Sequence, residues 1–152
     1  MCIRDSTIPP LLDRINVLHV KPKVYALPNV DALGPFRSEY GGLLGMFEEF
    51  PGKKNNEGKY FADADDIVKS NKLFRNLYKD KSHSVDAREF VRARLFDIMV
   101  GDWSRHEDNW KWAAFIDGEE TIYRPIPRDR DMVYSKWDGI LPSIADLSLI
   151  HI

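Results

Sequence analysis

Polar side chains concentrate in two short clusters near the C-terminal end of the sequence. The first cluster, residues 101–109, reads GDWSRHEDN and ends on Asn109, and the second, residues 127–131, reads PRDRD and contains Asp129 and Asp131. Amide and carboxylate oxygens are hard ligands of the kind that Mg²⁺ prefers, and one or two from the protein suffice when phosphate and water complete the octahedron. These side chains therefore predict a magnesium site suited to phosphoryl transfer.

The segment between the two clusters predicts a β-hairpin. Residues 110–116 and 121–126 have strand-forming composition, and they flank an Asp-Gly turn at residues 117–118, which is a strong hairpin signal. A hairpin returns the chain close to its own start. We therefore expect the second polar cluster to lie beside the first.

Three arginines accompany these candidate ligands. Arg105, Arg128 and Arg130 would supply fixed positive charge for phosphate oxygens. The alternative for residues 128–131 is a surface network of alternating charges, which adds little stability, and for residues 104–109 it is a polar loop with locally paired charges. His106 is more typical of a structural histidine that hydrogen-bonds a backbone carbonyl.

The run SRHEDN, residues 104–109, resembles the DRHxxN catalytic loop of phosphoinositide kinases and related atypical kinases. HipA-like and CotH-like kinases share the order of loop, hairpin and aspartate. The resemblance implies Mg²⁺ and ATP as cofactors, with Asn109 and either Asp129 or Asp131 holding the metal. It assigns the catalytic loop to Asp102, Ser104, Arg105 and His106, and phosphate contacts to Arg128 and Arg130.

Longer phrases resemble the middle region of large bacterial envelope proteins. The phrases are FEEFP, RARLFDIMVGDWSRHEDNWKW and YRPIPRDRDMVYSKWDG. Those proteins carry a calcineurin-like metallophosphoesterase domain upstream and an outer-membrane barrel of the surface-antigen type downstream. The resemblance implies a location in the periplasm or outer membrane, and neighbouring domains of the same protein as partners. The alternative function is a non-catalytic connector between the phosphoesterase and the barrel, which binds a partner.

One residue departs from that pattern. The envelope-protein phrase usually reads GDWDRHED, so an aspartate is expected where this chain has Ser104. A hydroxyl near neutral pH is a poor proton acceptor, so either Asp102 or Asp108 compensates for the missing base or this copy is catalytically weak or dead. The resemblance also implies that the nucleotide-anchoring lysine and the glycine-rich loop precede Met1. We therefore expect this chain to be weak or inactive as a kinase.

The elements that must position these residues predict an α+β fold that resembles part of a protein kinase. Residues 7–51 would hold the end of an N-lobe, with a helix at 9–18, a strand at 20–27, a loop at 28–42 and a buried strand at 43–50. Residues 52–146 would form a helical, C-lobe-like region with the hairpin. The hinge residues bordering the nucleotide base would be Glu48, Glu49 and Phe50.

Two helices are predicted before the first polar cluster. The first covers residues 63–78, with Asp63 as its cap, and the second covers residues 84–100, with Ser84 as its cap. Gly101 stands where a helix commonly ends in the left-handed conformation. The core-facing stripe of the second helix is predicted from its spacing: Ala87, Val91, Leu95, Ile98 and Met99.

Composition limits the classes of function. The chain has 152 residues, 43% of them hydrophobic and 30% charged, which suits one modest globular domain. A net charge of −2 argues against a general nucleic-acid binder. No apolar run approaches the ~20 residues of a membrane span, and the single cysteine, Cys2, excludes a disulfide framework. Residues 1–6 and 147–152 resemble translated sequencing-adapter tails, so we expect the natural protein to continue beyond both.

Overall fold

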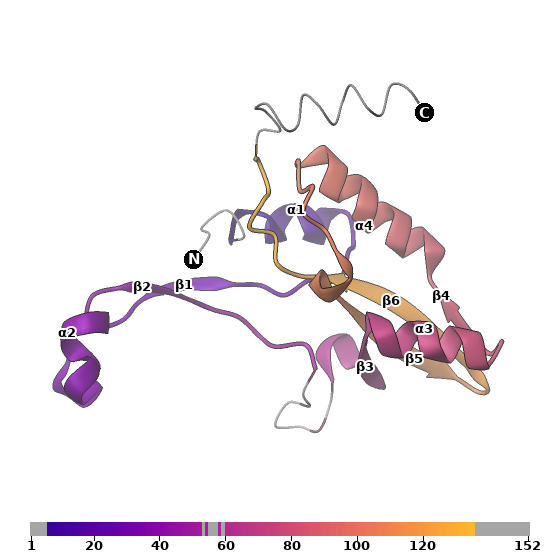
Figure 1. Cartoon of the computed structure of the whole chain (residues 1–152), viewed down its shortest axis with the longest axis horizontal. Helices are drawn as coiled ribbons and strands as arrows, with labels where there is room; N and C mark the ends of the chain where they lie inside the picture. Colours follow the sequence, from indigo (N-terminus) through magenta and orange to yellow (C-terminus); the bar gives the residue numbers. More distant parts are fainter. Residues whose placement is uncertain (1–5, 53, 55–57, 59, 136–152) are drawn as a thin grey trace.

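The computed structural model describes residues 6–52, 54, 58 and 60–135. The predicted adapter-derived segments therefore lie outside the described residues, apart from Ser6. The architecture is mixed α+β, as predicted, and is built around a four-stranded sheet with the strand order β3-β5-β6-β4 (Figure 1). Within the described residues, no helix is long and apolar enough to cross a membrane.

The hairpin at the centre of the sheet is confirmed. Strands β5 (Trp110–Asp117) and β6 (Glu120–Pro127) pair antiparallel from Trp110 opposite Pro127 to Asp117 opposite Glu120. Only two residues connect them, and Gly118 takes a positive φ of 61°, which glycine adopts without steric cost. The hairpin brings the ends of both polar clusters to the same edge of the sheet.

The first predicted helix is wrong in its first half. Residues Phe61–Asp63 form a 3₁₀ turn, η3, and Asp66–Lys69 form strand β3, so helix α3 covers only Ser70–Lys79. The β-branched pair Ile67 and Val68 favours a strand, and Val68 is buried opposite Trp112 of β5. Asp63 has a positive φ and does not cap the helix, since the capping position belongs to Lys69.

The second predicted helix is confirmed, but its cap and its buried face are corrected. Helix α4 covers Ala87–Met99 after a short strand, β4 (His83–Val85), which pairs parallel with β6. Asp86, and not Ser84, caps α4 by accepting the Glu89 N–H at 3.0 Å. Gly101 follows with the expected positive φ, 70°.

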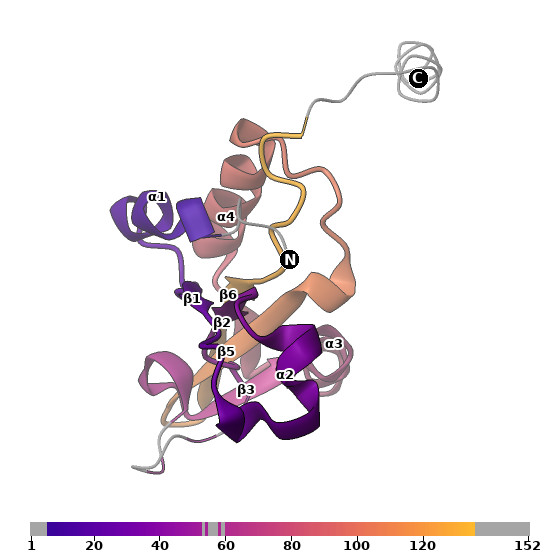
Figure 2. The ribbon, with the colours of Figure 1, turned by 90° about the vertical axis from the view of Figure 1, so that its left-hand side faces the viewer.

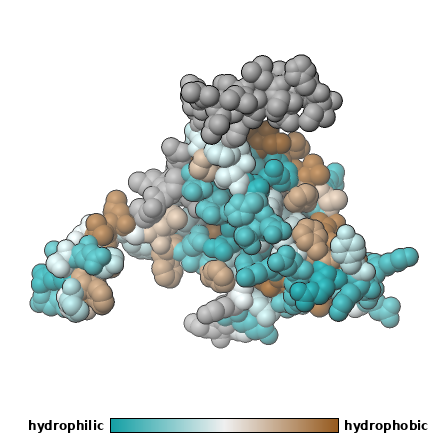
Figure 3. Space-filling model, in the orientation of Figure 1, coloured by the Kyte–Doolittle hydropathy of each residue, from teal (hydrophilic) through white to brown (hydrophobic). Residues whose placement is uncertain are grey.

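The side of α4 that faces the core differs from the predicted stripe. Phe96 and Asp97 are buried, whereas Leu95 is 61% exposed and Met99 is 71% exposed. Val91 and Ile98 are exposed as well, and apolar side chains gather over α4 in the space-filling view (Figure 3). The buried residues Ala93, Phe96 and Asp97 lie on roughly the opposite side of the helix from the predicted stripe, and Asp97 forms its ion pairs inside the molecule from that side.

One face of the sheet carries the main core. Trp110, Trp112 and Tyr123 pack there with Leu73 of α3 and Phe96 of α4. Helix α1 (Pro9–Arg14) adds Leu12 to the same core, and Ile8 joins it from the position before the helix; α1 ends earlier than predicted. Ala113 and Ile126 lie on the other face, where Leu18, Tyr60 and Phe61 cover them.

Residues 23–47 form a separate two-stranded ribbon. Strands β1 (Lys23–Ala26) and β2 (Leu44–Phe47) pair only with each other, and the ribbon extends away from the main sheet (Figures 1 and 2). The predicted burial of residues 43–50 is wrong, because Leu44 and Phe47 are 56% and 73% exposed. The loop predicted between the strands contains a 3₁₀ turn, η2 (Asp31–Phe36), and helix α2 (Arg37–Tyr40).

Candidate functional site

Asn109 and Asp129 lie side by side at the edge of the sheet. Asn109 closes the short 3₁₀ turn η4 (Glu107–Asn109) before β5, and its Nδ2 donates a hydrogen bond of 3.1 Å to Oδ2 of Asp129. The backbone N–H of Arg128 donates to the Asn109 carbonyl at 2.8 Å, which extends the hairpin pairing by one step. The predicted approach of the two clusters is therefore present in the structure.

The two members of this pair differ in their exposure. Asn109 is buried, and its Oδ1 accepts the backbone N–H of His106 at 3.1 Å. Asp129 is exposed and takes a positive φ of 57°. The pair therefore presents one carboxylate to solvent, held in place by the buried amide.

The two remaining candidates beside this pair are also exposed. Asp131 stands two residues beyond Asp129 on the surface, and the His106 side chain is exposed at the start of η4. Among the described residues, no group of three or more His, Cys, Asp or Glu side chains has the arrangement of a metal site. A metal at Asp129 would therefore take most of its ligands from water and phosphate, as Mg²⁺ commonly does.

Arg105 and Arg130 belong to a buried ion-pair network rather than to an open phosphate site. Asp97 of α4 accepts hydrogen bonds from Arg105 Nε at 3.1 Å and from Arg130 Nη1 at 2.7 Å. The side chains of Arg105, Arg130 and Asp97 are 1%, 3% and 0% exposed. Arg94 adds a further bond of 3.0 Å to Asp97 from the edge of the network.

Asp102 is the second carboxylate of the network. It pairs with Arg105, and the hydroxyl of Ser104 lies 3.5 Å from its Oδ1. Burial raises the pKa of Asp102, and the nearby guanidiniums of Arg105 and Arg130 offset this only in part. Asp102 is therefore buried and paired, and it does not line the pocket that Asp108 and Arg128 border.

Arg105 connects this network to the candidate metal ligand. Its Nη1 donates to the carbonyl of Arg128 and, at 3.4 Å, to the carbonyl of Asp129. These bonds hold the chain where Asp129 adopts its positive φ. Of the four predicted catalytic residues, Arg105 therefore acts on the position of Asp129, and Ser104 is only half-buried beside Asp102.

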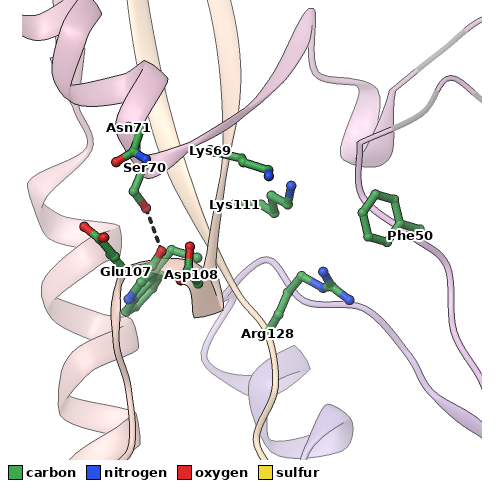
Figure 4. A pocket seen from close by; sticks show the side chains of 9 residues that line it. Phe50, Lys69, Ser70, Asn71, Glu107, Asp108, Lys111 and Arg128 are labelled. Carbon is green, nitrogen blue, oxygen red and sulfur yellow. Dashed lines mark hydrogen bonds between the residues drawn. The ribbon is translucent and has the colours of Figure 1, made fainter.

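A pocket of about 300 Å³ is lined by Asp108 and Arg128, which precede Asn109 and Asp129 in the chain, but Asn109 and Asp129 themselves do not line it (Figure 4). Arg128 borders it, forms an ion pair of 2.9 Å with Glu48, and lies with its Cζ 5.0 Å from the centre of the Phe50 ring. Of the three predicted hinge residues, Phe50 lines the pocket and Glu48 contacts it only through its ion pair with Arg128, whereas Glu49 is exposed and does not line it. The complete lining is Phe50, Lys69, Ser70, Asn71, Glu107, Asp108, Trp110, Lys111 and Arg128.

The lysines of this pocket are not among the residues predicted from the sequence. Lys69 ends β3 and lies directly opposite Lys111 of β5 in the antiparallel register. Lys69 was not predicted, because a helix over residues 63–78 would give it no partner strand. The signal that points to it is the β-branched pair at residues 67–68, which favours a strand at this point.

Comparison with protein-family models, with curated proteins and with solved structures finds no match to this chain. The geometry of the site therefore carries the functional argument.

Proposed function

We propose that this chain carries the metal- and nucleotide-binding part of a kinase-like phosphotransferase of the bacterial cell envelope. The hydrogen bond of 3.1 Å between Asn109 and Asp129 is the observation that carries this proposal. It joins the last residue of the SRHEDN loop to the first aspartate after the hairpin, which are the two positions that bind metal in atypical kinases. Asp129, rather than Asp131, is the proposed ligand.

The chemistry asked of these residues is limited. Phosphoryl transfer needs a cation beside the phosphate oxygens and a group that orients the attacking hydroxyl. Asp129 would bind Mg²⁺, with water and phosphate as the remaining ligands. Asn109 was predicted as a second ligand, but its Nδ2 faces Asp129 and its Oδ1 accepts the His106 N–H, so it would fix the carboxylate instead. The pocket lined by Asp108, Arg128 and Phe50 would receive the nucleotide.

The catalytic base is the weak part of the site. Ser104 stands where the related motif has aspartate, and its hydroxyl contacts Asp102 at 3.5 Å. Asp102 is buried, whereas Asp108 is exposed and lines the pocket. We therefore expect nucleotide and metal binding to exceed any phosphotransfer activity.

Thermal unfolding with ATP and Mg²⁺ tests the proposal. A ligand at 100 times its Kd raises the free energy of unfolding by about 2.7 kcal/mol, so the two together should raise the melting temperature above that with ATP alone. Asp129→Asn should abolish the Mg²⁺-dependent part of the shift. Asp117→Asn, which removes one exposed carboxylate at the opposite end of the hairpin, is the matched control and should leave it unchanged.

A second candidate function is the non-catalytic connector. It is favoured by the ion-pair network, which gives Arg105, Arg130 and Asp102 a structural role that needs no ligand. It predicts that neither ATP nor Mg²⁺ or Mn²⁺ changes the melting temperature. It also predicts that Asn109→Ala and Asp129→Ala leave binding to the neighbouring domains intact.

A further inference from the structure

We propose that the pocket between β3, the start of α3 and β5 binds the phosphate group of a ligand that also carries hydroxyl groups, through Lys69, Lys111 and Arg128. This inference rests on the proposed function and extends it, because it names the residues that would receive the phosphate. The three cations need no metal to attract an anion, so their role can be tested separately from that of Asp129.

The two lysines form the core of the proposed phosphate site. Lys69 and Lys111 are directly opposite each other on antiparallel strands, so their side chains leave the same face of the sheet. Like charges at such positions destabilise a sheet. Within the described residues, neither ammonium group forms an ion pair with a carboxylate that would relieve this repulsion. An anion placed between them would relieve it.

Arg128 and Phe50 complete the cationic half of the pocket. In the close view, Lys69, Lys111 and Arg128 extend toward the region beside Phe50 (Figure 4). Lys111 Nζ lies 5.4 Å from the centre of the Phe50 ring, and Arg128 Cζ lies 5.0 Å from it. Burial, together with the charges of Lys69 and Arg128, lowers the pKa of Lys111, as expected for crowded cations that lack a counterion.

Arg128 has guanidinium nitrogens that could still donate hydrogen bonds to a ligand. One of its terminal nitrogens pairs with Glu48, and its Nε is buried without a hydrogen-bond partner.

The first turn of α3 adds a weaker attraction for a phosphate group. Ser70 and Asn71 line the pocket, and no side chain caps this end of the helix, so its free N–H groups add positive potential.

The opposite wall of the pocket is acidic, which narrows the class of ligand. Glu107 and Asp108 lie across from the lysines in Figure 4, near Ser70. Carboxylates accept hydrogen bonds from hydroxyl groups but repel phosphate groups, so the phosphate groups of a ligand belong on the side of the three cations. A phosphate ester of a polyol or sugar satisfies both halves, with the phosphate on the lysines and the hydroxyls on the acidic wall.

Calorimetric titration of the 152-residue chain in EDTA, without added metal, tests the inference. We expect pyrophosphate to bind, and the double variant Lys69→Gln/Lys111→Gln to bind at least tenfold more weakly. The matched control is Lys79→Gln/Lys81→Gln, which removes two exposed lysines at the far end of α3 and should bind within twofold of the unchanged chain. The melting temperature of the double variant should not fall, because two repelling charges are removed. Failure of the unchanged chain to bind, or an equal loss in the control, would overturn the proposal.

Two further titrations distinguish a phosphate ester from free phosphate, and the phosphate site from the proposed metal site. Ribose 5-phosphate should bind more tightly than inorganic phosphate if the acidic wall accepts hydroxyl groups, and equal affinities would overturn that part. Asp129→Asn should retain pyrophosphate binding in EDTA. Pyrophosphate binding without any metal binding would contradict the proposed function alone, whereas metal binding without pyrophosphate binding would contradict this inference alone.

Discussion

Asp97 is the carboxylate on which the buried charges of this molecule depend. It lies on the core-facing side of α4 and accepts bonds from Arg94, Arg105 and Arg130. Through Arg105, the same network reaches the carbonyl of Asp129. A single residue in a helix is therefore connected to the candidate metal ligand by two hydrogen bonds.

Neutralising the two carboxylates of this network should lower the free energy of unfolding by different amounts. Asp97→Asn leaves two buried guanidiniums with only Asp102 between them, and breaking a buried ion pair costs roughly 3–5 kcal/mol. Asp102→Asn should cost less, because burial already disfavours the charged form of this group. Urea denaturation of both variants measures the difference. Equal costs would contradict this account of the network.

The raised pKa of Asp102 also predicts the sign of a pH effect. A carboxyl group with a raised pKa binds its proton more tightly in the folded state, so its stabilising contribution is complete below 3.8. That contribution is lost as the pH rises through the folded-state pKa. The stability of the unchanged chain relative to Asp102→Asn should therefore fall between pH 3.8 and the raised value.

At the scale of elements, substitutions in α4 test which side of this helix is buried. Phe96 is buried against the sheet, whereas Leu95 is 61% exposed. Phe96→Ala should cost about 3–5 kcal/mol of unfolding free energy because it leaves a cavity. Leu95→Ala should change it by less than about 1 kcal/mol, since surface substitutions have small effects. The predicted stripe would require the reverse order, so equilibrium unfolding of the two variants decides the question.

Local signals predicted those parts of the site that depend on neighbouring residues. The Asp-Gly turn was enough to predict the hairpin, and the hairpin was enough to bring Asp129 to Asn109. Strand β3 was missed because it depends on pairing with β5, and the Lys69–Lys111 pair was missed with it. The burial of Arg105 and Arg130 was missed because it depends on Asp97, a charged residue on the core side of a helix.

At the scale of the whole molecule, the described residues divide into a packed sheet with its helices and a protruding ribbon. Strands β1 and β2 pair only with each other, and their side chains are largely exposed. An isolated pair of strands is at best marginally stable. The ion pair between Arg128 and Glu48 joins the segment after β2 to the site.

Amide hydrogen exchange should reveal this division. Amides of Val24 and Met46 in the ribbon should exchange through local opening, with little protection. Amides of Ala113 and Tyr123 in the central hairpin should exchange only through global unfolding, because they are buried in the sheet. Equal protection in both regions would show that the ribbon is held by more than its own pairing.

Binding of Mn²⁺ in the presence of ATP, followed by the electron paramagnetic resonance signal of the free ion, tests the central claim most directly. The unchanged chain and Asp131→Asn should each bind one Mn²⁺ with similar affinity, and Asp129→Asn should bind it at least tenfold more weakly. Equal binding by Asp129→Asn and the unchanged chain, or a loss that follows Asp131 instead, would contradict the assignment of the metal to the Asn109–Asp129 pair.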